Sequence, residues 1–260
     1  MSVRPAAVAG MFYPDDREQL LAEVRRYMDL ADPPVPDFPL RGLIVPHAGY
    51  IYSGPIAGFG YRLLRNANFS RIIMLGPSHF VAFRGLALPG VDAMATPLGA
   101  VEIDAEVAGR LLASPLVLDS AHAHRREHSL EVQLPFLQEV LPTVPVVPIL
   151  TGDVDAAAAA ELLEDVMTVD TLLLVSSDLS HYHTAATARR LDAATARSIT
   201  KLDAETLGWD SACGRTGIQI ALHIALRRSY AVTTLDLRNS ADTAGSPDRV
   251  VGYGSFAIAG

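Results

Sequence analysis

The sequence predicts an α/β protein: one three-layer domain with a mostly parallel central sheet of about seven strands, flanked by helices. Short runs of branched apolar residues alternate with amphipathic segments along the chain. Such runs are typical of strands buried on both faces, because helices must cover both sides of a parallel sheet. The 260 residues are 50% hydrophobic and contain no Ser/Gly-rich or charged linker. We therefore expect residues 1–260 to form a single domain with a large core.

The N-terminal half predicts three helices set between strands. Asp15 and Asp16 precede apolar residues that recur at three- and four-residue spacing from Leu20 to Met28, as in a capped amphipathic helix. Pro55 suits the start of a second helix. In order, we expect the first helix, a strand at 43–45, a helix from Pro55, a strand at 72–75, short strands at 85–89 and 99–103, and a helix capped by Asp104.

The C-terminal half predicts a similar alternation. From His128 the pattern becomes helical, and His128 and Glu131 would then share one helix face. Pro148 removes a ladder donor from the apolar run around it, which weakens the strand prediction there. In order, we expect a helix from His128, a strand at 146–150, a helix at 155–168, a strand at 172–175, helical stretches at 185–199 and 204–207, a helix after Cys213, and strands at 231–237 and 250–258.

Three of the predicted strands run into a histidine. His47, His79 and His181 each follow an apolar run and a short segment rich in Gly, Pro or Ser. Ligands bind outside the carboxyl ends of the strands in such sheets, so these histidines are expected to converge on one site. A single histidine after a strand is more often structural. Two with the same context, His47 and His79, favour a shared metal site, because histidine is the commonest protein metal ligand.

Cys213 is the only cysteine, so it is either a small buried apolar residue or a working thiol. It lies at or just before a predicted helix N-terminus, where the helix dipole favours a thiolate. Asp178 and His181 resemble an orienting carboxylate and a catalytic base, although Asp178 could equally cap a helix.

Charge and composition exclude several classes of protein. The net charge is −8, and Lys and Arg form no cluster longer than an isolated pair, which argues against a nucleic-acid partner. The first residues lack the apolar core of a signal peptide, and no run of about eighteen apolar residues would span a membrane. We therefore expect a soluble cytoplasmic protein with no membrane partner.

Six motifs that occur in order along the chain resemble the Memo family. They are VAGMFYP at 8–14, PHAGY at 46–50, GPSH at 76–79, EHSLEVQLPF at 127–136, SSDLSH at 176–181 and CGR at 213–215. The resemblance spans nearly the whole chain. The Memo family is similar in fold to the class III extradiol dioxygenases, whose non-haem Fe(II) is held by two histidines and a glutamate.

The resemblance implies a metal site in which a cysteine stands where a carboxylate ligand would be expected. A thiolate gives a softer site, which suits Cu(I) or Zn(II) as well as Fe(II). His181 would match the acid/base histidine of the dioxygenases. The candidate residues are His47, His79 and Cys213 for the metal, His181 and Asp178 for catalysis, and Tyr52, His128 and Glu131 for substrate binding.

The function that the resemblance implies is that of a metal-binding, dioxygenase-like oxidoreductase. It would act with O2 on a small substrate, and an aromatic molecule is one candidate. Fe(II) is the expected metal, with Cu or Zn as alternatives, and a radical-SAM protein is the expected partner. Two alternatives stay open: a redox or metal-sequestering protein without an organic substrate, and a peptide-binding scaffold. An apolar pocket beside the metal would favour the enzyme, and a filled pocket with an exposed apolar rim would favour the scaffold.

Overall fold

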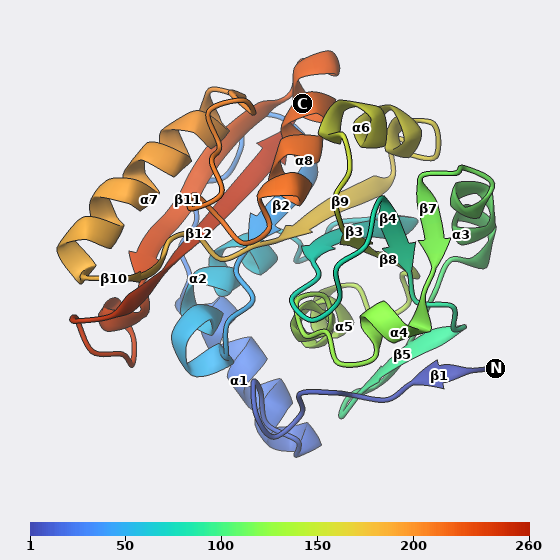
Figure 1. Ribbon diagram of the computed structural model, residues 1–260. Coiled ribbons are helices and arrows are strands. Elements are labelled where there is room, and N and C mark those ends of the chain that lie inside the picture. Colours follow the sequence, from blue (N-terminus) through green and yellow to red (C-terminus); the bar gives the residue numbers. More distant parts are fainter.

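The computed structural model describes residues 1–260, which form twelve strands and eight α-helices (Figure 1). The strands are β1 (Val3–Arg4), β2 (Leu40–Val45), β3 (Arg71–Pro77), β4 (Leu86–Leu88), β5 (Ala93–Thr96), β6 (Gly99–Glu102), β7 (Val117–Asp119), β8 (Val146–Thr151), β9 (Thr171–Ser176), β10 (His181–His183), β11 (Ala231–Asn239) and β12 (Val250–Ala259). The helices are α1 (Arg17–Leu30), α2 (Tyr50–Arg62), α3 (Ala105–Leu112), α4 (Ala121–His124), α5 (Leu134–Val140), α6 (Ala156–Glu164), α7 (Ala185–Thr200) and α8 (Arg215–Arg227), with 3-10 helices η1 (Glu131–Gln133) and η2 (Ser240–Asp242).

The central sheet has nine strands and is mixed. Its order is β10-β12-β2-β9-β3-β8-β4-β7, and β11 pairs with β12 outside this path. The middle strands β2, β9, β3 and β8 are parallel, whereas β12 runs antiparallel to β2 and β4 runs antiparallel to β8. The α/β prediction is confirmed. The expectation of a mostly parallel sheet holds only for the middle, because β11 and β12 form a long hairpin that adds antiparallel strands.

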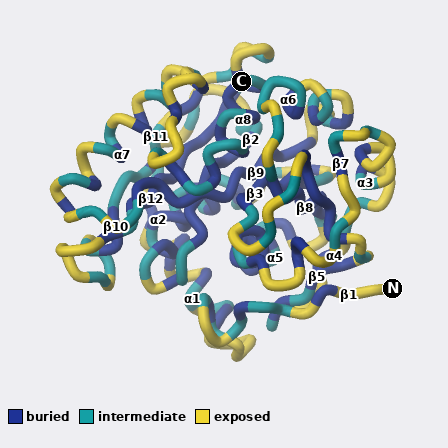
Figure 2. The backbone as a smooth tube through the Cα atoms, in the orientation of Figure 1, coloured by how far each residue is buried: buried dark blue, intermediate teal, exposed yellow.

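Helices cover both faces of this sheet and give the protein two apolar cores. One core packs α1, α2 and α5 against the sheet, and the other packs α3, α6, α7 and α8. Figure 2 shows the middle strands buried between these layers, with exposed residues on the outer helices, the loops and the peripheral strands such as β1 and β7. A parallel strand must be covered on both faces, which explains why β3 and β9 consist almost entirely of apolar residues.

A small second sheet, β1-β5-β6, lies beside the main one. Its strands lie at the N-terminal end of the chain and in the excursion that precedes α3. The prediction of short strands at 85–89 and 99–103 is confirmed by β4 and β6.

Most predicted helices begin at the expected caps. Asp16, Asp104 and Asp155 each accept a hydrogen bond from a backbone N–H of the first turn of α1, α3 and α6. Three predictions are wrong. Helix α2 begins at Tyr50 and not at Pro55. The helix predicted from His128 is absent, since residues 128–130 precede a 3-10 turn, and the helical stretch predicted at 204–207 is absent as well. Pro55 is tolerated inside α2 because it leaves only the carbonyl of Ile51, on a residue exposed to solvent, without its helical partner.

Pro148 lies in β8, which is an interior strand. Val146, two residues before Pro148, faces the β4 side of β8, since its carbonyl accepts the N–H of Asp104. Pro148 therefore faces that side too, where β4 pairs with β8 only at Leu150 and Thr151, so no strand requires a donor there. The pairing of β8 with β3 on the other side is in full register.

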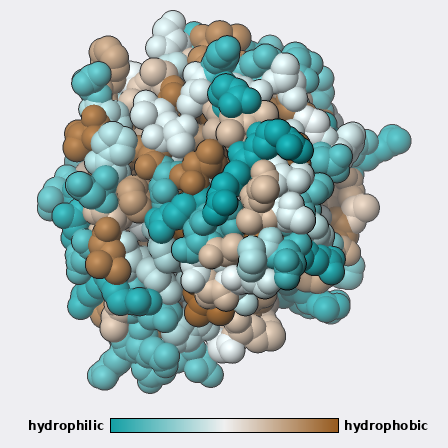
Figure 3. Space-filling view, turned by 90° about the vertical axis from the view of Figure 1, so that its left-hand side faces the viewer, coloured by the Kyte–Doolittle hydropathy of each residue, from teal (hydrophilic) through white to brown (hydrophobic).

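The outer surface shows no extended apolar area on the face that Figure 3 presents, where apolar side chains are scattered among hydrophilic ones. None of the helices combines the length and the apolar character needed to cross a membrane.

Candidate metal centre

The carboxyl ends of three neighbouring strands carry the residues of the site. β2, β9 and β3 are adjacent and parallel, so their ends lie at one edge of the sheet. His47 follows β2 by two residues and His79 follows β3 by two residues. Between them, Ser176 ends β9 and Asp178 follows it by two residues. The local sequence therefore delivers each side chain to the edge where α/β sheets bind ligands.

Three imidazoles form a group at this edge that can hold a metal ion. The ligand atoms of His47, His79 and His128 all lie within 4.8 Å of one another. The ring centroids are 5.2 Å apart for His47 and His79, and 4.6 Å apart for His79 and His128. Ligand nitrogens around a tetrahedral ion are roughly 3 to 4 Å apart, so small side-chain rotations would bring them into range.

His47 is buried, and its hydrogen bonds fix its tautomer. Its Nδ1 lies 2.9 Å from Oγ of Ser176, and that hydroxyl donates its one hydrogen to the carbonyl of Ser129 at 2.5 Å. Nδ1 must therefore donate, which leaves the lone pair of Nε2 free for a metal. Burial, reinforced by the neighbouring His79, lowers the pKa of His47 to about 3. The ring is thus neutral, as a ligand must be.

Glu127 orients His79, and the sequence analysis missed it. Its Oε1 accepts a hydrogen bond from Nδ1 of His79 at 2.9 Å, and its Oε2 accepts the backbone N–H of the same residue at 2.6 Å. Backbone N–H groups of His128 and Ser129 also donate to Oε1. Burial favours the neutral acid, but these hydrogen bonds and the nearby imidazole lower the pKa of Glu127 to about 2. A carboxylate on Nδ1 leaves Nε2 of His79 for the metal.

His128 belongs to the histidine group, although we assigned it to substrate binding and placed it on a helix face with Glu131, a spacing that metal sites in helical proteins use. Burial, followed by the influence of His47, lowers its pKa to about 4. Its ring packs on Phe12 at a centroid distance of 4.5 Å, which ties it to the N-terminal segment. The loop that carries it fits tightly against β3: a Cβ atom at Gly76 would come 2.7 Å from Leu130.

Cys213 lies beside His47 but outside the three-histidine group. Its Sγ is 3.2 Å from Nε2 of His47 and accepts the backbone N–H of Asp178 at 3.3 Å. Gly214 makes this approach feasible, since a Cβ atom there would lie 2.6 Å from the carbonyl of Ser176. Burial raises the pKa of the Cys213 thiol, and the carboxylate of Asp178 adds to the effect. The expected thiolate is thus absent without metal, because desolvation outweighs the α8 dipole.

Asp178 and His181 lie next to this group but are not bonded to each other. Oδ1 of buried Asp178 accepts the backbone N–H groups of His47 at 2.8 Å and Ala48 at 3.3 Å. Burial raises the pKa of Asp178. His181 begins β10, is half-buried, and is close enough to influence the charge of both His47 and Asp178. Asp178 therefore positions the turn that carries His47.

Glu131 and Tyr52 occupy different surroundings. Glu131 is fully buried, and its oxygens accept hydrogen bonds from Arg4, from the backbone of Ala7 and Val8 and from the hydroxyl of Tyr13. It holds the N-terminal segment in place, and its oxygens are not available to a substrate. Tyr52 lies in the first turn of α2, half-buried, and its hydroxyl makes no hydrogen bond within the protein.

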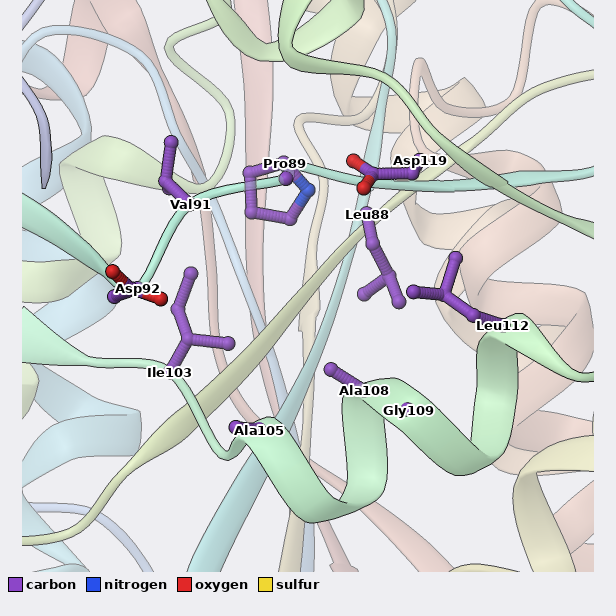
Figure 4. Close-up of a pocket in the computed structure, with 11 residues that line it drawn as sticks. Leu88, Pro89, Val91, Asp92, Ile103, Ala105, Ala108, Gly109, Leu112 and Asp119 are labelled. Carbon is purple, nitrogen blue, oxygen red and sulfur yellow. The ribbon is translucent and has the colours of Figure 1, made fainter. Parts of the chain in front are cut away.

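A cavity lies away from the histidines. It has a volume of about 250 Å³ and lies between α3 and the chain around Leu88 and Pro89, with Asp92 and Asp119 on either side of the apolar lining (Figure 4). The histidine group contributes no residue to this cavity or to four other cavities of 120 to 300 Å³. The candidate metal centre lies at the sheet edge, where His79 is exposed, His128 is half-buried and His47 is buried.

The fold and the site together define an α/β protein with a candidate three-histidine metal centre at the carboxyl edge of its sheet. The Memo-like protein family model matches residues 4–257, and the chain belongs to this family. A MEMO1 family protein of Aquifex aeolicus is 35% identical over 97% of this chain and 98% of the relative. One from Archaeoglobus fulgidus is also 35% identical, over 96% of this chain and 97% of the relative.

A solved structure, that of the uncharacterized protein JW3007 from Escherichia coli K12, is similar in part. It is 13% identical and has a TM-score of 0.46, and the match covers 83% of this chain and 99% of that one.

Proposed function

We propose that this protein is a metal-dependent, dioxygenase-like oxidoreductase that acts with O2 on a small molecule. The observation that carries the proposal is the convergence of three imidazoles, whose ligand atoms lie within 4.8 Å of one another at the carboxyl edge of the sheet. Two of them, His47 and His128, have pKa values lowered to about 3 and about 4, so both rings are neutral at pH 7. Fe(II) is the metal that we expect from the family resemblance, with Cu or Zn as alternatives.

The residues present fit such an ion. His47 and His79 each present an Nε2 that carries no proton. We propose Cys213 as the third ligand, since its sulfur lies 3.2 Å from Nε2 of His47 and would exchange that contact for the metal. His128 stands where it can replace the sulfur or add a fourth ligand. Metal binding would displace the thiol proton of Cys213. A bound Fe(II) would supply Lewis acidity and open positions for substrate and O2.

The remaining residues bind, orient and move protons in this proposal. Glu127 holds His79, and Asp178 holds the backbone of His47. His181 has no hydrogen bond to either carboxylate, so its ring is free to take a proton from a bound hydroxyl group and return it. Tyr52 has a free hydroxyl that can contact the substrate.

The test is anaerobic purification with metal analysis, followed by O2 uptake in the presence of catechols. We expect one metal ion per chain and uptake that is lost in His181→Ala, with the metal retained. Loss of the metal from His181→Ala as complete as from His47→Ala would contradict its role. If the Fe(II)-loaded protein took up no O2 with any of the catechols tested, the proposed enzymatic function would be wrong.

A second candidate function is a metal-binding scaffold for a peptide. One observation favours it: Phe80 and Tyr182, which follow His79 and His181 in sequence, are exposed apolar side chains. Metal retention without O2 uptake, together with binding of peptides, would favour the scaffold over the enzyme.

A further inference from the structure

Asp192 is a buried acidic residue of α7 that the proposed function does not use. It is 2% exposed, and its Oδ1 accepts the backbone N–H of Ser180 at 3.0 Å. Burial raises the pKa of Asp192, and Ser180 and the nearby His181 and His183 oppose part of that rise. A buried carboxyl group is costly, and an asparagine could accept the same N–H without a charge. An acid at this position therefore indicates a further role.

The hydrogen bond to Asp192 fixes the chain directly before His181. The carbonyl of Ser180 accepts the N–H of Gly252 at 2.8 Å, and the carbonyl of Gly252 accepts the N–H of Leu179 at 2.8 Å. Residue 252 must be a glycine, because a Cβ atom there would collide with the carboxyl group of Asp192. Three hydrogen bonds, from α7 and β12, thus hold Leu179 and Ser180 in place.

The chain directly after His181 has an uncommon conformation. Tyr182 has a φ of 64°, in the left-handed region that residues other than glycine seldom adopt. The pairing of β10 with β12 also shifts its register between His181 and His183. Such irregularities re-aim side chains and are frequent next to active sites. The backbone that carries the His181 ring is therefore set on both sides, by Ser180 before it and by Tyr182 after it.

His181 lies within electrostatic range of two buried carboxyl groups, those of Asp178 and Asp192. The titratable or charged groups around His181 are Asp178 after β9, His47 after β2, Asp192 on α7, His183 in β10, and Arg249, which lies over the ring of Tyr182. A carboxylate near an imidazole stabilises the protonated ring. The charge of Asp192 therefore bears on how readily His181 accepts a proton.

We propose that Asp192 is the positioning residue of His181: it fixes the backbone before the ring, and its carboxylate favours the protonated form of the ring. This proposal rests on the proposed function, in which His181 takes a proton from the substrate and returns it. A base must be aimed at the proton that it accepts, and it works best when its protonated form is stabilised. Asp192 itself touches no substrate and acts through His181 alone.

The variant Asp192→Asn removes the charge and keeps an oxygen that can accept the N–H of Ser180. An NMR titration of the metal-free protein follows the His181 ring, and His181→Ala identifies its signal. In Asp192→Asn, half-protonation of that ring should occur at a pH lower by about 0.5 to 1 than in the wild type. The control is Asp203→Asn, at an exposed position just beyond α7, which should leave the titration unchanged.

The variant Asp192→Ala removes the hydrogen bond as well as the charge. In the Fe(II)-loaded protein we expect it to lower kcat for O2 uptake by at least about tenfold, with the metal content and KM unchanged. The kcat of Asp192→Asn should lie between those of Asp192→Ala and the wild type.

An unchanged titration of His181 in Asp192→Asn would overturn the proposal, and so would a wild-type kcat in Asp192→Ala. Failure of the proposed function is a different outcome. It would appear as absent O2 uptake by the wild type, and the titration, which needs neither metal nor substrate, would still decide whether Asp192 acts on His181.

Discussion

Glu127 accepts a hydrogen bond from Nδ1 of His79 at 2.9 Å while accepting the backbone N–H of the same residue at 2.6 Å. One carboxylate thus fixes both the ring and the main chain of a candidate ligand. Both oxygens of Glu127 accept hydrogen bonds from N–H groups. A glutamine at this position would replace one of these oxygens by an NH2 group, whose hydrogens would face another N–H donor.

Our first prediction is therefore that Glu127→Gln weakens metal binding by about 10- to 100-fold, the usual effect of losing a carboxylate behind a histidine ligand. Competition with a chelator of known affinity would measure it. Glu102→Gln, at an exposed position, is the matched control and should bind metal like the wild type. Unchanged affinity in Glu127→Gln would mean that His79 is not a ligand or does not need this support.

The second prediction concerns the identity of the third ligand. Co(II)-loaded protein should show a thiolate-to-metal charge-transfer band, because the ion replaces the proton on Cys213. We expect Cys213→Ser to lose the band and His128→Ala to keep it. A wild-type spectrum without the band, with Co(II) bound, would assign the site to the three histidines instead.

The sequence could predict how His47 and His79 meet, because each follows a buried strand and parallel strands end at one edge. It could not predict the role of Glu127 and His128. Both lie in an irregular segment whose position depends on contacts with distant residues, such as Phe12 against His128. The helical periodicity from His128 suggested that Glu131 shares its face, but the chain turns there before α5 begins.

Protonation of Cys213 shows a second limit of sequence reasoning. Its place before α8 was predicted correctly, and the dipole rule then favoured a thiolate. Burial and the charge of Asp178 shift the pKa in the opposite direction. Such a balance depends on how many atoms surround the sulfur, which only the folded chain determines.

The third prediction concerns the ion pair between Arg4 and Glu131, which are 5% and 0% exposed and 2.6 Å apart. Arg4 also donates to the carbonyls of His124 and Glu127, so it holds the segment that carries His128. Arg4→Met should lower the free energy of unfolding by about 3–5 kcal/mol, because a buried carboxylate loses its partner.

Urea denaturation would measure this loss. The control is Arg25→Met, which removes the exposed partner of Glu139 and should cost about 0–1 kcal/mol. Equal effects of the two substitutions would show that the other hydrogen bonds of Glu131 stabilise its buried charge without Arg4. Arg4→Met should also weaken metal binding by the folded protein, because Arg4 holds the segment that carries His128.

The last prediction concerns the pH dependence of stability in the metal-free protein. His124 is buried, and its Nε2 donates to the carbonyl of Ala87 at 2.8 Å. Burial lowers its pKa to about 4, against about 6.5 in an unfolded chain. The unfolded state therefore binds a proton more readily, so the folded protein loses stability as the pH falls from 6.5 to 4. At pH 5 the loss from this one group is about 2 kcal/mol.

Urea denaturation of the wild type and of His124→Gln at several pH values between 7 and 5 tests this, since an amide can keep the bond to Ala87 without titrating. The wild type should lose more stability than the variant over this range, and the difference should equal the contribution of His124. His47 and His128 also have lowered pKa values and act in the same direction in both proteins, so stability should still fall in the variant. Parallel curves for the two proteins would show that His124 takes up its proton in the folded state as easily as in the unfolded one.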